Sequence, residues 1–137
     1  MKITSIMLVK NFRNKQVASM AGKLLQRIVE ERSRVKIQKH TGEYKIVLAL
    51  ENGIGEEGFK IEDTENGIKI SGNDERGLIY GVGKFLRSCR FYDDGIEPGT
   101  WRGKSVPIKP VRGMYFATHF HNFYHDAPLR RVERYVE

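Results

Sequence analysis

Cysteine is almost absent from this chain of 137 residues, which contains only Cys89. No intramolecular disulfide can form, so a packed core has to hold the fold together. Cys89 falls on the apolar side of a predicted helix, which indicates a buried and unreactive thiol rather than a nucleophile.

Long apolar runs are also missing. No stretch approaches the ~20 continuous apolar residues that span a bilayer, so no membrane partner is expected. The run at residues 3–9 is too short and too interrupted for a signal-peptide core, and no small-residue cleavage site follows it. If Met1 is the native start, we expect a cytoplasmic protein.

The basic excess is not concentrated in any part of the sequence. The net charge is +7, with 14 basic and 11 acidic residues up to position 83 and 10 and 6 after it. A basic nucleic-acid-binding module is therefore an alternative that rests on net charge alone. A solvated surface is the expected reading of these charges, and nucleic acid is not the expected partner.

Apolar residues alternate along several short segments of the first half, which is typical of half-buried strands. These segments are 3–9, 35–37 and 44–50. An amphipathic helix capped by Asn14 is predicted between the first two, and such a one-sided helix should lie on a sheet. Its apolar residues recur at intervals of three and four: Val17, Met20, Ala21, Leu24, Leu25, Ile28 and Val29.

A hairpin followed by a second helix is predicted for residues 58–90. Alternating runs at 59–61 and 68–70 indicate two strands, and Asn66-Gly67 is a turn signal because both residues tolerate positive φ. Asn73 or Asp74 can cap the next helix. Its apolar residues follow at helical spacing: Leu78, Ile79, Val82, Phe85, Leu86 and Cys89.

Three glycines interrupt this second helix, namely Gly77, Gly81 and Gly83. Each costs ~1 kcal/mol of helix propensity relative to alanine, so a packing reason is expected. A phosphate-binding loop is excluded because Gly83-Lys84 is followed by Phe85 instead of serine or threonine. The dinucleotide fingerprint fails too, because Leu86 stands where its last glycine belongs. Close approach of the helix to the sheet is the predicted role.

The hairpin and glycine-notched helix resemble the small α/β domain that precedes the catalytic barrel in hexosaminidases and related glycoside hydrolases, α-glucuronidases among them. Their Gly-x-x-Tyr-Gly pattern is matched by Gly77-Leu-Ile-Tyr80-Gly81, and the resemblance covers about residues 44–90. In that family the small domain supports and a following (β/α)8 barrel catalyses. The resemblance implies that residues 1–92 form a support domain, with two helices on one face of an antiparallel or mixed sheet.

The composition changes after residue 92. Turn-forming residues, including Pro98, Pro107 and Pro110, predict a linker over 93–110. A nearly continuous apolar run at 111–118 is typical of a strand buried on both faces. Residues 127–137 return to helical spacing. We therefore expect an α+β domain followed at 111–137 by the first β-α unit of a (β/α)8 barrel.

Polar side chains gather directly after the apolar run, where His119, His121 and Asn122 follow one another closely. Barrel active sites are built from the carboxyl ends of the strands. We predict these three residues as substrate-binding ligands of sugar hydroxyl groups in a complete barrel.

The resemblance is partial at this point. Hexosaminidases usually follow the Arg-Gly that opens their first strand with an aspartate and then a sugar-binding arginine. The chain keeps Arg112-Gly113 but has Ala117 and Phe120 at those two positions. The carboxylate pair that hydrolyses glycosides would lie later in the barrel, so no catalytic residue is expected in this chain.

A metal-dependent hydrolase is the other alternative. His119-x-His121 at the end of a first barrel strand also matches the metal pair of amidohydrolases, and two imidazoles on one strand can chelate zinc. That family usually has an aspartate where Ala117 stands, so neither a metal nor another cofactor is expected.

The sequence thus predicts an accessory domain of a carbohydrate-active enzyme that is inactive by itself. Its expected partners are the rest of a longer glycoside hydrolase and, through the barrel, a carbohydrate.

Overall fold

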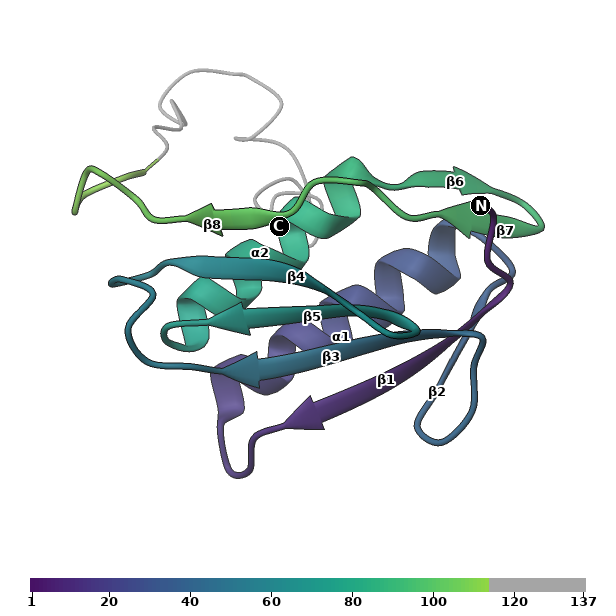
Figure 1. Ribbon diagram of the computed structural model, residues 1–137, viewed down its shortest axis with the longest axis horizontal. Helices are drawn as coiled ribbons and strands as arrows, with labels where there is room; N and C mark the ends of the chain where they lie inside the picture. The colour runs from purple at the N-terminus through teal and green to yellow at the C-terminus, as the bar shows by residue number, and fades with distance from the viewer. Residues whose placement is uncertain (114–137) are drawn as a thin grey trace, which may run out of the picture.

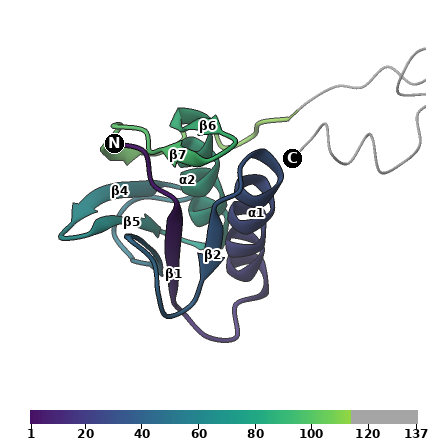
Figure 2. The same cartoon turned by 90° about the vertical axis from the view of Figure 1, so that its right-hand side faces the viewer.

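The computed structural model describes residues 1–113 and contains a mixed β-sheet with two helices on one of its faces (Figures 1 and 2). The predicted α+β class, with both helices on one face of a mixed sheet, is confirmed, and so is the predicted order of elements up to the second helix. The predicted start of a barrel at 111–137 falls, from residue 114 on, outside the described residues. The elements are β1 (Ser5–Asn11), α1 (Gln16–Arg32), β2 (Lys36–Gln38), β3 (Tyr44–Leu50), β4 (Phe59–Thr64), β5 (Gly67–Gly72), α2 (Glu75–Ser88), β6 (Arg90–Tyr92), β7 (Gly95–Glu97) and β8 (Gly103–Ser105).

The main sheet has six strands in the order β2-β1-β3-β5-β4-β8. Strands β2, β1, β3 and β5 are parallel to one another, whereas β4 is antiparallel to both of its neighbours. Ile46 lies opposite Ile68, and Leu48 opposite Ile70, so the branched side chains of the central strands stack across the sheet.

The core lies between the sheet and the two helices. Alternate residues of the strands point toward α1 and α2, whose apolar stripes close over them. Phe85, one of the apolar residues at helical spacing in the sequence, is 2% exposed. The side chains least accessible to solvent are Ile3, Ile6, Leu25, Val29, Val35, Ile46, Leu48, Ile61, Ile68, Ile70, Leu78 and Ile96.

The opposite face of the sheet carries charged side chains. Glu51 accepts hydrogen bonds from Lys69 at 3.1 Å and from Lys60 at 3.2 Å. The Lys69 and Lys60 ammonium groups hold the pKa of Glu51 at about 2. Both helices lie on the other side of the sheet (Figure 1), and on this face the charged side chains lie beside Val9 and Val47, which share the row of Lys69.

The segment predicted as a linker contributes two strands to the fold. Strand β7 pairs with β6, and Ile96 exchanges two backbone hydrogen bonds with Ile3 at 2.8 and 2.9 Å. Strand β8 pairs with β4 and becomes the sixth strand of the main sheet. Trp101 precedes β8 and packs on Phe59, with 5.8 Å between ring centroids. The chain therefore crosses the whole domain before it reaches Gly113.

Helix α1 begins differently from the prediction. Asn14 does not cap it: its backbone is left-handed, with φ of 53°, and Lys15 occupies the cap position without a side-chain hydrogen bond. The carboxylate of Glu75, in the first turn of α2, instead accepts a hydrogen bond from the amide of Ala18 at 2.7 Å. The orphan amide at the start of α1 is thus satisfied by the neighbouring helix.

The predicted hairpin is present, but its turn is centred one residue earlier. Thr64 pairs with Gly67, which leaves Glu65 and Asn66 as the turn, and Asn66 is not among the residues with positive φ. Gly67 is required for another reason: with φ of 154°, a Cβ there would lie 2.0 Å from the carbonyl oxygen of Lys45. Its hydrogen atom allows β5 to approach β3.

We predict opposite effects for alanine at two glycines of α2. At Gly77 a Cβ would lie 2.1 Å from the carbonyl oxygen of Gly58, whereas at Gly83 it would meet only the end of the Arg87 side chain, at 3.2 Å. Gly77→Ala should therefore lower the free energy of unfolding by about 2–4 kcal/mol. Gly83→Ala should raise it by about 0.5–1 kcal/mol through helix propensity.

Urea unfolding followed by circular dichroism measures both changes. Equal stabilisation by the two substitutions would contradict the contact between the backbones at Gly77 and Gly58.

Candidate functional site

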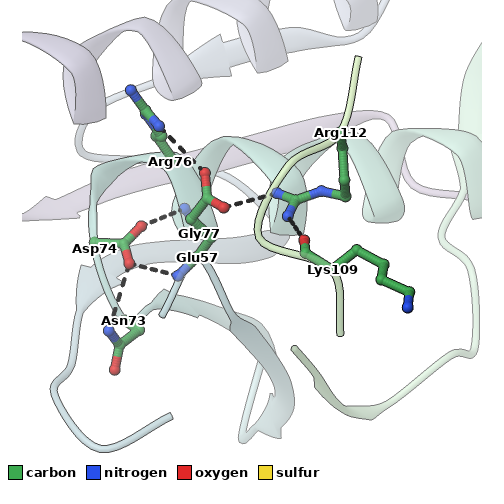
Figure 3. Close-up of polar contacts among 7 residues, drawn as sticks. All are labelled: Glu57, Asn73, Asp74, Arg76, Gly77, Lys109 and Arg112. Carbon is green, nitrogen blue, oxygen red and sulfur yellow. Dashed lines mark hydrogen bonds and ion pairs between the residues drawn. The ribbon is translucent and has the colours of Figure 1, made fainter. Parts of the chain in front are cut away.

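The sugar ligands predicted from the sequence, His119, His121 and Asn122, lie outside the described residues 1–113. The polar groups that the structure does bring together surround the start of α2 and the end of the described chain. They come from the loop 51–58, from α2 and from residues 109–112 (Figure 3).

The start of α2 is held to the loop 51–58 by two adjacent side chains. Of the two predicted candidates, Asp74 caps the helix, by accepting from the amide of Gly77 at 2.8 Å. Its other oxygen accepts from the amide of Glu57 at 2.6 Å. The Asn73 side chain accepts from the amides of Ile54 and Gly55 at 3.1 and 3.0 Å. The loop and the helix therefore form one rigid junction.

The side chain of Glu57 points from this junction toward Arg112, near the end of the described residues (Figure 3). Its backbone is left-handed, with φ of 55°, and its side chain is only 16% exposed. The carboxylate accepts from Arg112 at 2.8 Å and from Arg76 at 3.4 Å. The Arg112 guanidinium, more than any other group, holds the pKa of Glu57 below its ordinary value of 4.5. Glu57 is therefore a fixed anion at neutral pH.

Arg112 connects the junction to the last described residues. It donates to the carbonyl oxygen of Lys109 at 2.5 Å and lies over the ring of Tyr80, 5.8 Å from the ring centroid. The hydrogen bond to Glu57 raises the pKa of Arg112 above its ordinary value. Arg112 belongs to the Arg-Gly pair of the sequence analysis, and its partner Glu57 was not predicted. Only a close-packed junction brings them together.

A pocket of about 710 Å³ opens beside the junction and is lined by four carboxylates together with Lys15 and Arg76. Glycoside hydrolysis needs a carboxylic acid whose pKa is raised so that it can donate a proton. Burial works to raise the pKa of Asp74, but the hydrogen bonds from Gly77 and Glu57 lower it overall. Asp74 and Glu57 are both ionised, so neither of them can serve as that acid.

A second depression, which we call the helix groove, separates the outward sides of the two helices. It has a volume of about 400 Å³. It is lined by Met20, Lys23, Leu24 and Arg27 of α1 and by Ile79, Tyr80, Gly83 and Arg87 of α2. Tyr80 therefore belongs both to the groove and to the contact with Arg112.

Reactive groups of other kinds are scarce in the described part. Burial raises the pKa of the Cys89 thiol to about 11, in agreement with the prediction of an unreactive cysteine. Among residues 1–113, no three histidine, cysteine or acidic side chains are grouped to hold a metal. No helix described there has the length and apolar character to cross a bilayer.

This fold and its glycine-notched α2 agree with a known family. Residues 6–90 match the family model of glycosyl hydrolase family 20, domain 2, which is more than half of the chain. The chain belongs to this family and carries a domain of a carbohydrate-active enzyme. A comparison with curated proteins gives no match.

Solved structures with a related arrangement are much longer than this chain. A GH138 enzyme targeting pectin rhamnogalacturonan II is 20% identical with a TM-score of 0.50, over 61% of this chain and 13% of its own. A chitobiase of Flavobacterium johnsoniae is 13% identical with a TM-score of 0.48, over 76% and 18%. The N-acetyl-β-hexosaminidase of Streptomyces plicatus is 18% identical with a TM-score of 0.46, over 75% and 22%. The chain thus spans less than a quarter of each.

We predict that the junction gives the domain an acid-sensitive stability. The pKa of Asp74 is lowered from 3.8 in the folded state, so its contribution is present above pH 3.8 and is lost as the pH falls below that value. Asp74→Asn should cost about 1–2 kcal/mol at pH 7 and flatten the loss of stability between pH 4 and pH 2.

Urea unfolding at pH 7 and pH 3 tests this expectation. Glu65→Gln, in the exposed hairpin turn, is the control and should leave both values unchanged. A pH dependence that is identical in wild type and Asp74→Asn would contradict the assigned role.

Proposed function

We propose that this chain is the non-catalytic support domain of a glycoside hydrolase together with the first part of its catalytic barrel. In this proposal residues 1–92 form the support domain and residues 111–137 begin the barrel. Residues 93–110 connect the two and contribute strands β7 and β8 on the way. The reacting carboxylates would belong to later parts of the barrel.

The junction at Glu57 is the observation that carries this proposal. Asp74 accepts from two backbone amides, and the carboxylate of Glu57 accepts from Arg76 and Arg112. These charges are used to fix the backbone at the point where the chain passes on to Gly113. Such an arrangement suits a domain that positions the polypeptide following it.

Binding of carbohydrate is proposed to occur outside the described residues, through the barrel. His119, His121 and Asn122 follow the apolar run at 111–118, which places them at the catalytic end if that run is the first barrel strand. Their imidazole and amide groups can donate to and accept from sugar hydroxyl groups. The aspartate and arginine that hexosaminidases usually carry in this segment are replaced by Ala117 and Phe120.

The purified chain of 137 residues should not hydrolyse glycosides. We expect no release of 4-nitrophenol from 4-nitrophenyl glycosides, including the N-acetyl-β-glucosaminide, above the rate of a matched blank. The physical reason is that Glu57 and Asp74 are both held ionised and cannot donate the proton that the leaving group needs. Turnover that disappears in Glu57→Gln would overturn the support role.

A longer polypeptide that contains this chain should depend on His121. His121→Ala is expected to raise KM or lower kcat for a glycoside by about tenfold, the loss of one or two hydrogen bonds to substrate, with bound metal unchanged. Metal analysis of both proteins separates the alternatives. Stoichiometric zinc that is lost with His121→Ala would instead favour a metal-dependent hydrolase.

A further inference from the structure

Large apolar side chains are exposed in two parts of the described chain. On the outward side of the helices, Met20 is 56% exposed and Tyr80 40% exposed. After β8, Ile108 is 92% exposed and Val111 is 89% exposed. Isolated apolar side chains on a surface are normal, but a grouped set marks an interaction surface.

The helix groove and the end of the described chain are continuous with each other. Tyr80 lines the groove, and the Arg112 guanidinium lies over its ring. Arg112 is in turn fixed by Glu57 at 2.8 Å. Arg112, the residue before Gly113, therefore lies beside the groove.

We propose that the helix groove is the docking site of residues 114–137 of this chain. The apolar side of the helix predicted at 127–137 would lie between α1 and α2, in contact with Met20, Leu24 and Ile79. The Arg112–Glu57 ion pair would set where this segment starts. The proposal deepens the proposed function, because it names the surface through which the support domain holds the module that follows.

The length of the segment allows this docking. Residues 114–126 can span up to roughly 43 Å when extended, at about 3.3 Å per residue. The groove follows α1 from Met20 to Arg27, which corresponds to about 10 Å of helix, whereas residues 127–137 would form a helix of about 16 Å. The segment can therefore reach every part of the groove.

The chemistry of the segment also fits the groove. Its predicted helix has an apolar side made by Leu129, Val132 and Val136. At helical spacing Glu133 and Glu137 lie along one edge of that side, whereas Arg130, Arg131 and Arg134 lie farther around the helix. The groove combines apolar side chains with basic groups at its edges, from Lys23 and Arg87. An apolar stripe with carboxylates along one edge can pack on the apolar part of the groove and pair with its basic groups.

Reaction of an introduced thiol in the full chain tests the proposal. Met20→Cys places a thiol in the groove, and Tyr92→Cys places one on β6, where the side chain is 42% exposed. Each rate of reaction with 5,5′-dithiobis(2-nitrobenzoic acid) is divided by the rate of the same protein in denaturant. Native Cys89 is corrected for with the unsubstituted protein, and its pKa of about 11 makes it slow.

We expect Met20→Cys to react about tenfold more slowly than Tyr92→Cys, because the docked segment covers it. The basic groups of the groove act in the opposite direction, since they would lower the pKa of a thiol there and speed its reaction. Leu129→Asp with Val132→Asp should restore the rate at Met20→Cys and leave Tyr92→Cys unchanged. Arg131→Asp, a charge change in the same segment, is the matched control and should leave Met20→Cys slow.

Equal rates for Met20→Cys and Tyr92→Cys would overturn the docking and leave the support role standing. A slow rate that Leu129→Asp and Val132→Asp do not change would overturn it as well, and so would protection that depends on protein concentration, since a second copy would then cover the groove. Thermal unfolding by circular dichroism checks that each variant folds. Lys23→Cys probes the same groove if Met20→Cys does not fold.

Discussion

The contact between the backbones at Gly77 and Gly58 is the constraint on which the other contacts around α2 depend. With no side chain at Gly77, the first turn of α2 lies directly against the loop 51–58. This approach allows the Asp74 carboxylate to accept hydrogen bonds from the amide of Gly77 in the helix and from the amide of Glu57 in the loop. A methyl group at position 77 would push the loop away and separate these partners, since a packed interior has no room to yield.

The same end of the helix pair also decides how α1 begins. Glu75, in the first turn of α2, accepts from the amide of Ala18 in α1. Each helix start has partial positive charge, and a carboxylate satisfies an orphan amide at both starts. Two of the acidic side chains around the pocket, Glu57 and Asp74, are therefore structural anions. The hydrogen bonds from Arg112 to Glu57 and from two backbone amides to Asp74 are sufficient to explain the lowered pKa values of both carboxylates, without a catalytic role.

Much of the fold could be predicted from the sequence because its signals are local. Alternation marked the strands, and intervals of three and four marked both helices, including the buried side of Phe85. The sequence predicted a cap at Asn73 or Asp74, and the structure shows that Asp74 is the cap. The prediction at Asn14 was wrong, because a capping residue is recognised in a sequence by its type alone. In the structure the amide of Ala18 is satisfied by Glu75, which lies 57 positions later in the sequence.

The candidate site was less predictable, because its members come from distant parts of the chain. Glu57 lies in a loop, Tyr80 on α2 and Arg112 after the last strand, and no spacing in the sequence connects them. Strand β8 was missed for a similar reason: three exposed residues have no apolar alternation, and only pairing with β4 makes them a strand.

The sequence by itself determined the strand and helix pattern, the apolar sides of both helices and the family to which the domain belongs. The tertiary structure alone decided which residue satisfies the start of α1, why Gly67 and Gly77 must lack side chains, and which carboxylate holds Arg112. The physical reason is range. Propensity and periodicity act between residues a few positions apart, whereas close approach of backbones and ion pairing are set only when the sheet and helices have packed.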